Sequence, residues 1–170
     1  MMRLSTVVFA LVLALPTLGE AKDYVAPDGK LTAKVMTRSQ KDCEAVILIE
    51  KRAHVLAKEK HQSDDHQHGM CVDKAGWTAD SQFFVFSLYS SGGHQPWHTP
   101  IMFFSKRLGR IVPLEHFVAG AITESKFELS SPDVIEFTTT EFPIDTSPSK
   151  LRKLSLGILS RMDPKHPQHP

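Results

Sequence analysis

The strongest hydrophobic pattern in the chain runs from Gln82 to Tyr89. Successive side chains of a β-strand point to opposite faces. Here both faces carry large hydrophobic side chains, namely Phe84, Phe86 and Leu88 on one face and Phe83, Val85 and Tyr89 on the other. A strand with one wet face alternates hydrophobic with polar residues, whereas a strand buried on both faces does not. The pattern therefore predicts a strand at the centre of the sheet.

Shorter hydrophobic runs on both sides of this segment predict further strands. Residues 45–49 and 54–57 predict a hairpin, although residues 53–60 contain good helix formers and leave a helix open as the alternative. Residues 101–104 resume the hydrophobic pattern after a polar interruption at 90–98. We therefore expect a long hairpin loop between two central strands.

In the C-terminal half the hydrophobic runs are shorter and are separated by turns. Residues 114–118 predict one helical turn, 133–142 a strand rich in β-branched residues, and 151–159 either a strand or a short helix. Residues 78–81, Thr-Ala-Asp-Ser, carry the strongest turn signal of the chain. Taken together, these runs predict an all-β fold, a single antiparallel domain of about eight strands arranged as a sandwich or a propeller-like stack.

The first 21 residues are typical of an export signal. Arg3 precedes a hydrophobic stretch without charges that ends at Pro16, and Gly19 and Ala21 supply the small side chains that signal peptidase accepts. The stretch is shorter than the roughly 20 apolar residues that span a bilayer core. We therefore expect cleavage before Lys22, no membrane anchor afterwards, and a secreted or periplasmic protein. The expected organisation is a signal peptide at 1–21, an antiparallel β domain at 22–162 and a disordered, proline-rich tail at 163–170.

Charge and cysteine content narrow the classes of partner and the redox setting. The formal net charge is +1 and the basic residues are scattered, which argues against a nucleic-acid partner. Cys43 and Cys71 are the two cysteines of the chain. Because exported proteins meet an oxidising compartment, we expect a disulfide between them. Two free thiols or a pair of metal ligands remain the alternative.

Histidines and carboxylates gather in the polar segment 59–69, which we expect to be a solvated loop. His61, His66 and His68, with Asp64 and Asp65 between them, could bind a divalent transition metal such as zinc, copper or nickel if they converged. The motifs that fix such convergence by spacing, H-E-x-x-H and C-x-x-C, are absent from the sequence. A polar loop without a ligand is therefore the competing interpretation.

The interruption at 90–98 supplies a second candidate site. Its candidate ligand-binding residues are Gly93, His94, Trp97 and His98. Adjacent glycines allow a partner close to the backbone, and tryptophan with histidine offers stacking and hydrogen bonds to a small ligand. The alternative is that Trp97 covers the edge of the phenylalanine-rich core, since large aromatic side chains more often supply burial than recognition.

One phrase of the sequence resembles a known repeat architecture. Trp77-Thr-Ala-Asp-Ser-Gln-Phe-Phe-Val-Phe86 is similar to the strand–turn–strand phrase of many β-propeller blades. The longer segment 77–98, with Ser-Ser-Gly-Gly-His and Pro-Trp-His, resembles small exported bacterial proteins of uncharacterised function. That resemblance implies an extracytoplasmic setting and brings no catalytic residues with it.

These observations favour a binding protein over an enzyme. We expect an exported, soluble, non-enzymatic binding or interaction module whose ligand or protein partner lies outside the cytoplasm. A metal-binding protein that uses the histidine-rich loop is the first alternative. A hydrolase built from Ser91, His94 and Asp80 is the second and has less support, because no G-x-S-x-G nucleophile motif is present.

Overall fold

The fold is all-β, as the sequence predicts. A computed structural model describes residues 21–37, 44–62, 69–90, 99–144 and 146–162. The strands in this part of the chain are β1 (Ala21–Val25), β2 (Thr32–Thr37), β3 (Ala45–Lys51), β4 (His54–Lys60), β5 (Met70–Trp77), β6 (Phe83–Ser90), β7 (Ile101–Ser105), β8 (Arg110–Pro113), β9 (Ala121–Ser130), β10 (Val134–Thr140) and β11 (Ser149–Ser155). The two helices are a 3-10 turn, η1 (Leu114–Phe117), and the short α1 (Leu156–Leu159).

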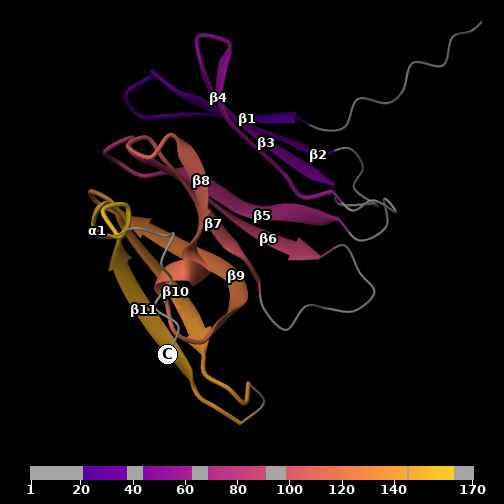
Figure 1. Cartoon of the computed structure of the whole chain (residues 1–170), viewed down its shortest axis with the longest axis vertical. Helices are drawn as coiled ribbons and strands as arrows, with labels where there is room; N and C mark the ends of the chain where they lie inside the picture. Colours follow the sequence, from indigo (N-terminus) through magenta and orange to yellow (C-terminus); the bar gives the residue numbers. More distant parts are fainter. Residues whose placement is uncertain (1–20, 38–43, 63–68, 91–98, 145, 163–170) are drawn as a thin grey trace, which may run out of the picture.

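Three antiparallel sheets, each built from consecutive strands, lie face to face. The first sheet has the order β1-β2-β3-β4, the central sheet β5-β6-β7-β8, and the third sheet β11-β10-β9. Figure 1 shows them as three successive layers along the chain, with the central sheet between the other two. The first strands of neighbouring sheets approach one another, since β5 contacts both β1 and β9.

The described residues form eleven strands where about eight were expected. β1 is a strand that no hydrophobic run predicts; it lies at the edge of the first sheet, its side chains are mostly exposed, and two of its five residues, Lys22 and Asp23, are charged. Charged side chains are common on edge strands because they discourage pairing with other chains. They also conceal the hydrophobic alternation on which a sequence-based prediction depends.

The central sheet forms one hydrophobic core on each of its faces. The first core joins it to the first sheet and contains Leu31, Val35, Ile47, Ile49, Phe84, Phe86, Leu88 and Phe104, among other buried residues. The second core joins it to the third sheet and contains Phe83, Val85, Ile101, Phe103, Phe127, Ile135, Phe137 and Leu156, among others. The prediction that β6 is central and buried on both faces is therefore confirmed.

Tyr89 is the exception on β6. Its side chain is 44 % exposed and belongs to neither core cluster, so the expectation that it faces a buried layer was wrong. Tyr89 is the second-last residue of the strand, where its phenol hydroxyl can remain in water.

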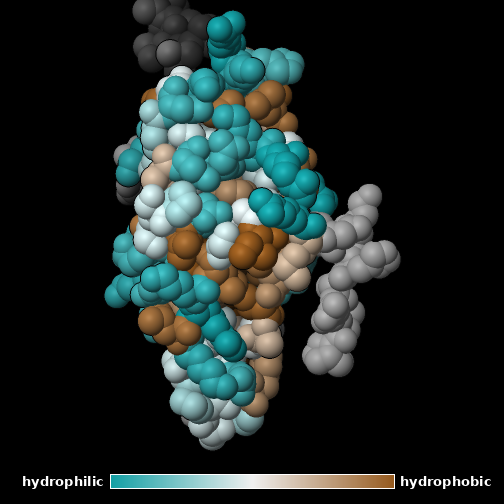
Figure 2. Space-filling model, turned by 90° about the vertical axis from the view of Figure 1, so that its left-hand side faces the viewer, coloured by the Kyte–Doolittle hydropathy of each residue, from teal (hydrophilic) through white to brown (hydrophobic). Residues whose placement is uncertain are grey.

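Short hairpin turns close one end of the stack. The Asp28 backbone N–H donates to the Ser81 hydroxyl (3.0 Å), and the Lys106 ammonium pairs with the Asp28 carboxylate (3.3 Å). A hydrogen bond from the Lys30 backbone N–H, together with the Lys106 ammonium, lowers the pKa of Asp28. The turn at 78–81 is confirmed, with Ser81 in the left-handed region at φ 61°. Figure 2 shows this end, where hydrophilic side chains cover much of the surface around exposed hydrophobic ones.

The structure also decides between helix and strand for the segments that the sequence left open. β3 and β4 form the expected hairpin, so the helical alternative for residues 53–60 is excluded. Residues 114–118 contain the expected helical turn, η1. Residues 151–159 contain both structures that the sequence left open, because β11 runs into α1 at Ser155. There Asp133 accepts hydrogen bonds from the Ser155 hydroxyl (2.8 Å) and the Gly157 backbone N–H (2.7 Å).

We predict that truncating the core side chain Phe84 to alanine costs about 3–5 kcal/mol of the free energy of unfolding. Phe84 is fully buried between the first and central sheets and contacts the rings of Tyr24 and Trp77. Leu151→Ala is the control, because Leu151 is 68 % exposed on β11 and should change stability by less than about 0.5 kcal/mol. Urea unfolding measures both, and equal losses would contradict the two-core arrangement.

Candidate functional site

Three connections of the chain start and finish at one edge of the stacked sheets. The His61 backbone N–H donates to the Ala45 carbonyl (2.9 Å), and the Met70 backbone N–H donates to the His61 carbonyl (3.0 Å). Met70 in turn pairs with Ser90, the last residue of β6. We call the edge formed by Ala45, His61, Met70 and Ser90 the loop edge.

The candidates singled out in the sequence are attached to the loop edge. Segments 38–43, 63–68 and 91–98 lie outside the described residues, and their neighbours along the chain are the residues of this edge. Those segments contain Cys43, His66, His68, Asp64, Asp65, Ser91, Gly93, His94, Trp97 and His98. His61 and Cys71 are the two candidates of this edge that the structure describes.

His61 is partly buried against Phe86 of the first core, so the expectation of a solvated loop beginning at Glu59 was wrong for this residue. Its ring meets the Phe86 ring edge-on, with centroids 6.1 Å apart. The backbone hydrogen bonds to Ala45 and Met70 draw His61 inward, which overrides its polar composition. Burial lowers the pKa of His61, and its Nε2 atom has no hydrogen-bond partner among the described residues. A neutral imidazole with an open nitrogen is a hydrogen-bond acceptor and a metal ligand.

Asp80 lies at the opposite end of β6 from the loop edge. It accepts a hydrogen bond from the Thr78 hydroxyl (2.6 Å) within the turn that precedes the strand. β6 runs from Phe83 to Ser90, and eight residues of strand extend roughly 25 Å at about 3.3 Å per residue. Asp80 therefore lies about the length of β6 away from Ser90, which does not support its pairing with Ser91 in the hydrolase alternative.

A buried carboxylate, that of Glu115, lies next to Ile101, on the C-terminal side of the connection between β6 and β7. The Ile101 backbone N–H donates to Glu115 Oε1 (3.1 Å), while Glu115 Oε2 is buried without a hydrogen-bond partner among the described residues. Burial raises the pKa of Glu115, although the hydrogen bond from Ile101 opposes the shift. Glu115 sits on η1, next to the second core. Sequence reasoning did not single it out, because a lone glutamate in a helical turn is ordinarily exposed.

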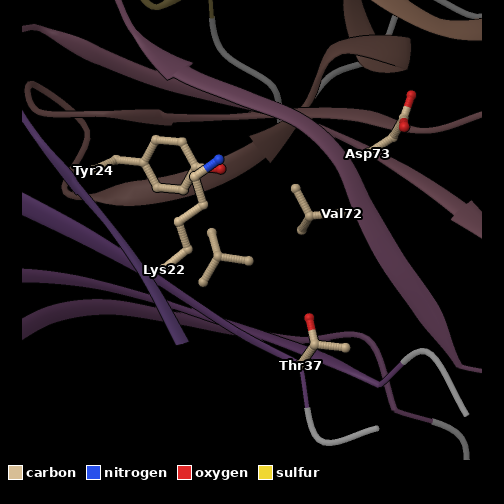
Figure 3. Close-up of a pocket in the computed structure, with 6 residues that line it drawn as sticks. Lys22, Tyr24, Thr37, Val72 and Asp73 are labelled. Atoms are coloured by element: carbon tan, nitrogen blue, oxygen red, sulfur yellow. The ribbon is translucent and has the colours of Figure 1, made fainter. Parts of the chain in front are cut away.

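A small cleft opens between the first and central sheets. Its volume is about 160 Å³, and it is lined by Lys22, Tyr24, Val35, Thr37, Val72 and Asp73. Figure 3 shows that Lys22 and Tyr24 come from β1 and Thr37 from the end of β2, whereas Val72 and Asp73 come from β5. Thr37 precedes segment 38–43 and Val72 is two residues beyond Met70, so the cleft adjoins the loop edge.

At Asp73 β5 is irregular, and the Asp73 side chain turns toward the third sheet. The pairing of β5 with β6 shifts register between Val72 and Ala75, and the Ser87 hydroxyl accepts from the Lys74 backbone N–H (3.2 Å) in place of a regular ladder bond. Such bulges re-aim side chains. The Ser125 hydroxyl of β9 donates to the Asp73 carboxylate. The cleft combines residues from different sheets, which is why no local motif predicted it.

Two negative findings apply to the described residues alone. Within this part of the chain no three histidine, cysteine, aspartate or glutamate side chains come together as a metal site. The helices found there are also too short to cross a membrane.

Comparisons with known proteins found one similar solved structure and no family. No protein-family model matches the chain, and no curated protein matches it in sequence. One solved structure, described as a conserved lipoprotein from Clostridium novyi NT, is similar with a TM-score of 0.46 and 14 % sequence identity. The match covers 84 % of this chain and 89 % of that one.

Glu115 makes the stability of the protein depend on pH. A carboxyl whose pKa is raised by folding stabilises the native state fully below its ordinary pKa of 4.5, and this contribution is lost as the pH rises through the folded value. We predict that Glu115→Gln raises the urea midpoint relative to wild type at pH 8 more than at pH 4. Glu124→Gln, an exposed change on β9, is the control and should show no such difference. An equal effect of Glu115→Gln at both pH values would refute the assignment.

Proposed function

We propose that this chain is exported and works outside the cytoplasm as a non-enzymatic binding module whose binding region is the loop edge. The observation that carries the proposal is the joining of Ala45, His61, Met70 and Ser90 by backbone pairing, which places the flanks of three connections together. Binding residues are disproportionately found on connections held by a rigid scaffold. Here the scaffold is the doubly buried central sheet.

The loop between β6 and β7 has firmly held flanks. The Leu88 backbone N–H donates to the Pro100 carbonyl (2.9 Å), and the Thr99 backbone N–H donates to the Ile122 carbonyl (2.6 Å) of the third sheet. The candidates Gly93, His94, Trp97 and His98 lie between these flanks in sequence. Fixed flanks reduce the entropy that a loop loses when it orders around a ligand, and this supports a recognition role for the segment.

Export and a disulfide belong to the same proposal. Cleavage after residue 21 would leave Lys22 as the first residue, already within β1 and paired with Val35. Cys71 is buried beside Met70, and Cys43 is two residues before Ala45, so the hydrogen bonds through His61 support a bridge between the cysteines. The described part of the chain contains no free cysteine.

A direct check uses protein recovered from the extracytoplasmic fraction. We predict that its N-terminal residue is Lys22 and that thiol titration of the unreduced, denatured protein finds no free thiol. Reduction should then release two thiols per chain. An N-terminus at Met1 or Met2 would contradict cleavage, and two free thiols before reduction would contradict the disulfide.

The binding role is tested by ligand-induced thermal stabilisation. A ligand that binds only the native state raises the melting temperature. We predict that at least one compound in a panel of sugars, amino acids, short peptides and divalent metals does so for wild type. We expect Trp97→Ala to lose that shift while its own stability changes little. Phe142→Ala removes an aromatic ring that is 66 % exposed on another connection and should keep the shift. A loss of several kcal/mol in ligand-free Trp97→Ala would make Trp97 a core residue, and no response to any compound would contradict the binding role.

A metal-binding function is the second candidate, and one observation favours it. The His61 Nε2 atom is buried at the loop edge without a partner among the described residues, and His66 and His68 follow in segment 63–68. Three imidazoles can hold zinc, with a fourth position left for water or a ligand. Elemental analysis of untagged protein separates the two functions, because a stoichiometric metal that is lost in His61→Gln supports this candidate and its absence removes it.

A further inference from the structure

We propose that the tip of the β3–β4 hairpin, residues 51–56, docks on the surface of an anionic lipid bilayer. This inference goes beyond the proposed function, because it assigns a second interaction surface at the other end of the first sheet. β3 begins at Ala45 on the loop edge and ends at Lys51, so the tip lies roughly 20 Å from that edge. Figure 1 shows the tip at the top of the molecule, away from the central sheet. Peripheral docking of this kind needs no membrane-spanning segment.

The tip carries positive charges without ionic partners. Lys51 and Arg52 are exposed in the turn, and Lys58 is exposed farther along β4. None of the three forms an ion pair with another side chain in the described ranges. An anionic surface can therefore bind these side chains without displacing an existing partner.

The carboxylates around the tip do not neutralise these charges. In the neighbouring turn between β1 and β2, Asp28 pairs with Lys106 (3.3 Å). On β3, Glu50 pairs with Lys34 of β2 (2.9 Å). Glu59 of β4 lies opposite a buried residue of β3 and so belongs to the inner face of the first sheet. The tip is therefore a local excess of positive charge.

Two adjacent aliphatic side chains lie beside these charges. Val55 is 43 % exposed and Leu56 is 40 % exposed. Consecutive residues of a regular strand point to opposite faces, so one of the two would ordinarily be covered. The pairing of β3 with β4 shifts register between Ile49 and Glu50, which leaves Leu56 as an extra residue. Such bulges re-aim side chains, and here both hydrophobic residues remain in contact with water.

Val25 extends the apolar surface across the outer face of the first sheet. In the strand register Val25 pairs with Thr32, Thr32 with Glu50, and Glu50 with Val55. Paired residues share one face of a sheet, so the exposed Val25 lies in the same row as Val55, roughly 14 Å away across three strand spacings. Figure 2 shows hydrophobic side chains among hydrophilic ones at the top of the molecule.

The backbone of the turn also favours a role beyond closing the hairpin. Arg52 and Ala53 have φ values of 50° and 65°, in the left-handed region that glycine and asparagine adopt most readily. Two-residue hairpin turns with such values usually contain Asn-Gly. Holding other residues there costs free energy, and strain of this kind is concentrated at functional sites. The turn therefore keeps a basic side chain at its tip at a cost in stability.

An anionic bilayer matches both features of the tip. Lipid phosphates attract exposed lysine and arginine near the membrane surface. The aliphatic side chains of Val55 and Leu56 can enter the boundary between headgroups and acyl chains, where apolar surface is removed from water. A soluble polyanion would use the cations and leave these two side chains in water. The combination of features therefore favours a lipid surface.

The test is co-sedimentation of protein recovered from the extracytoplasmic fraction with vesicles of phosphatidylglycerol and phosphatidylcholine in equal parts. We expect half of the protein to bind at about 1 mM accessible lipid or less, and at least about tenfold weaker binding to phosphatidylcholine alone. Added salt should weaken the binding, because it screens exposed charges. Absence of binding to the mixed vesicles overturns the inference.

Two variants separate the apolar and the basic part of the tip. Leu56→Ser and Arg52→Asn should each weaken binding to the mixed vesicles about fivefold or more. Asparagine tolerates the left-handed region better than arginine, so Arg52→Asn should leave the urea midpoint unchanged or raise it. A turn with a purely structural role would change in stability and not in vesicle binding.

Matched controls carry the same kinds of substitution elsewhere. Leu151→Ser changes an exposed leucine of the third sheet, and Lys60→Gln changes an exposed lysine at the opposite end of β4 from the tip. Both controls should bind the mixed vesicles as wild type does. Binding that survives Leu56→Ser and Arg52→Asn, or that falls equally in the controls, overturns the tip as the docking site. Retention on immobilised heparin without vesicle binding would replace the bilayer with a soluble polyanion.

Discussion

Burial of β6 on both faces is the constraint on which the rest of the structure depends. Phe84, Phe86 and Leu88 need one apolar layer, and Phe83 and Val85 need another. A single sheet cannot supply both, so the chain places a sheet before and a sheet after the central one. Tight packing of large aromatic side chains in two cores makes the central sheet a rigid support, since interiors of this kind deform little.

The same constraint gives the two ends of the stack different properties. At one end, short turns are tied together across sheets by Asp28, Ser81 and Lys106. At the other, His61 connects the first and central sheets through backbone hydrogen bonds, and three longer connections begin and end. Two polar atoms are left without partners in the described residues: His61 Nε2, next to segment 63–68, and Glu115 Oε2, whose carboxylate accepts from Ile101 after segment 91–98. Burying a polar atom without a hydrogen-bond partner costs free energy, and such atoms are common at binding and catalytic sites.

The sequence predicts the centre of this fold better than its edges or its cleft. The doubly hydrophobic pattern of 82–89, the 45–57 hairpin and the turn at 78–81 are local features, and the structure confirms them. β1 escaped prediction because a short, charged edge strand resembles a loop. Lys22 and Val72 are 50 positions apart and line one cleft only because two sheets stack, so no spacing rule could place them together. His61 was assigned to a loop because its burial comes from tertiary contacts alone.

Native-state hydrogen exchange tests the central claim most directly. If both faces of β6 are sealed by separate cores, the hydrogen-bonded amides of Val85, Phe86 and Leu88 should exchange only through global unfolding, with free energies equal to that of urea unfolding. The amides of edge strands β1 and β11 should exchange through smaller local openings. Amides of β6 that exchange as readily as those of the edge strands would contradict the account.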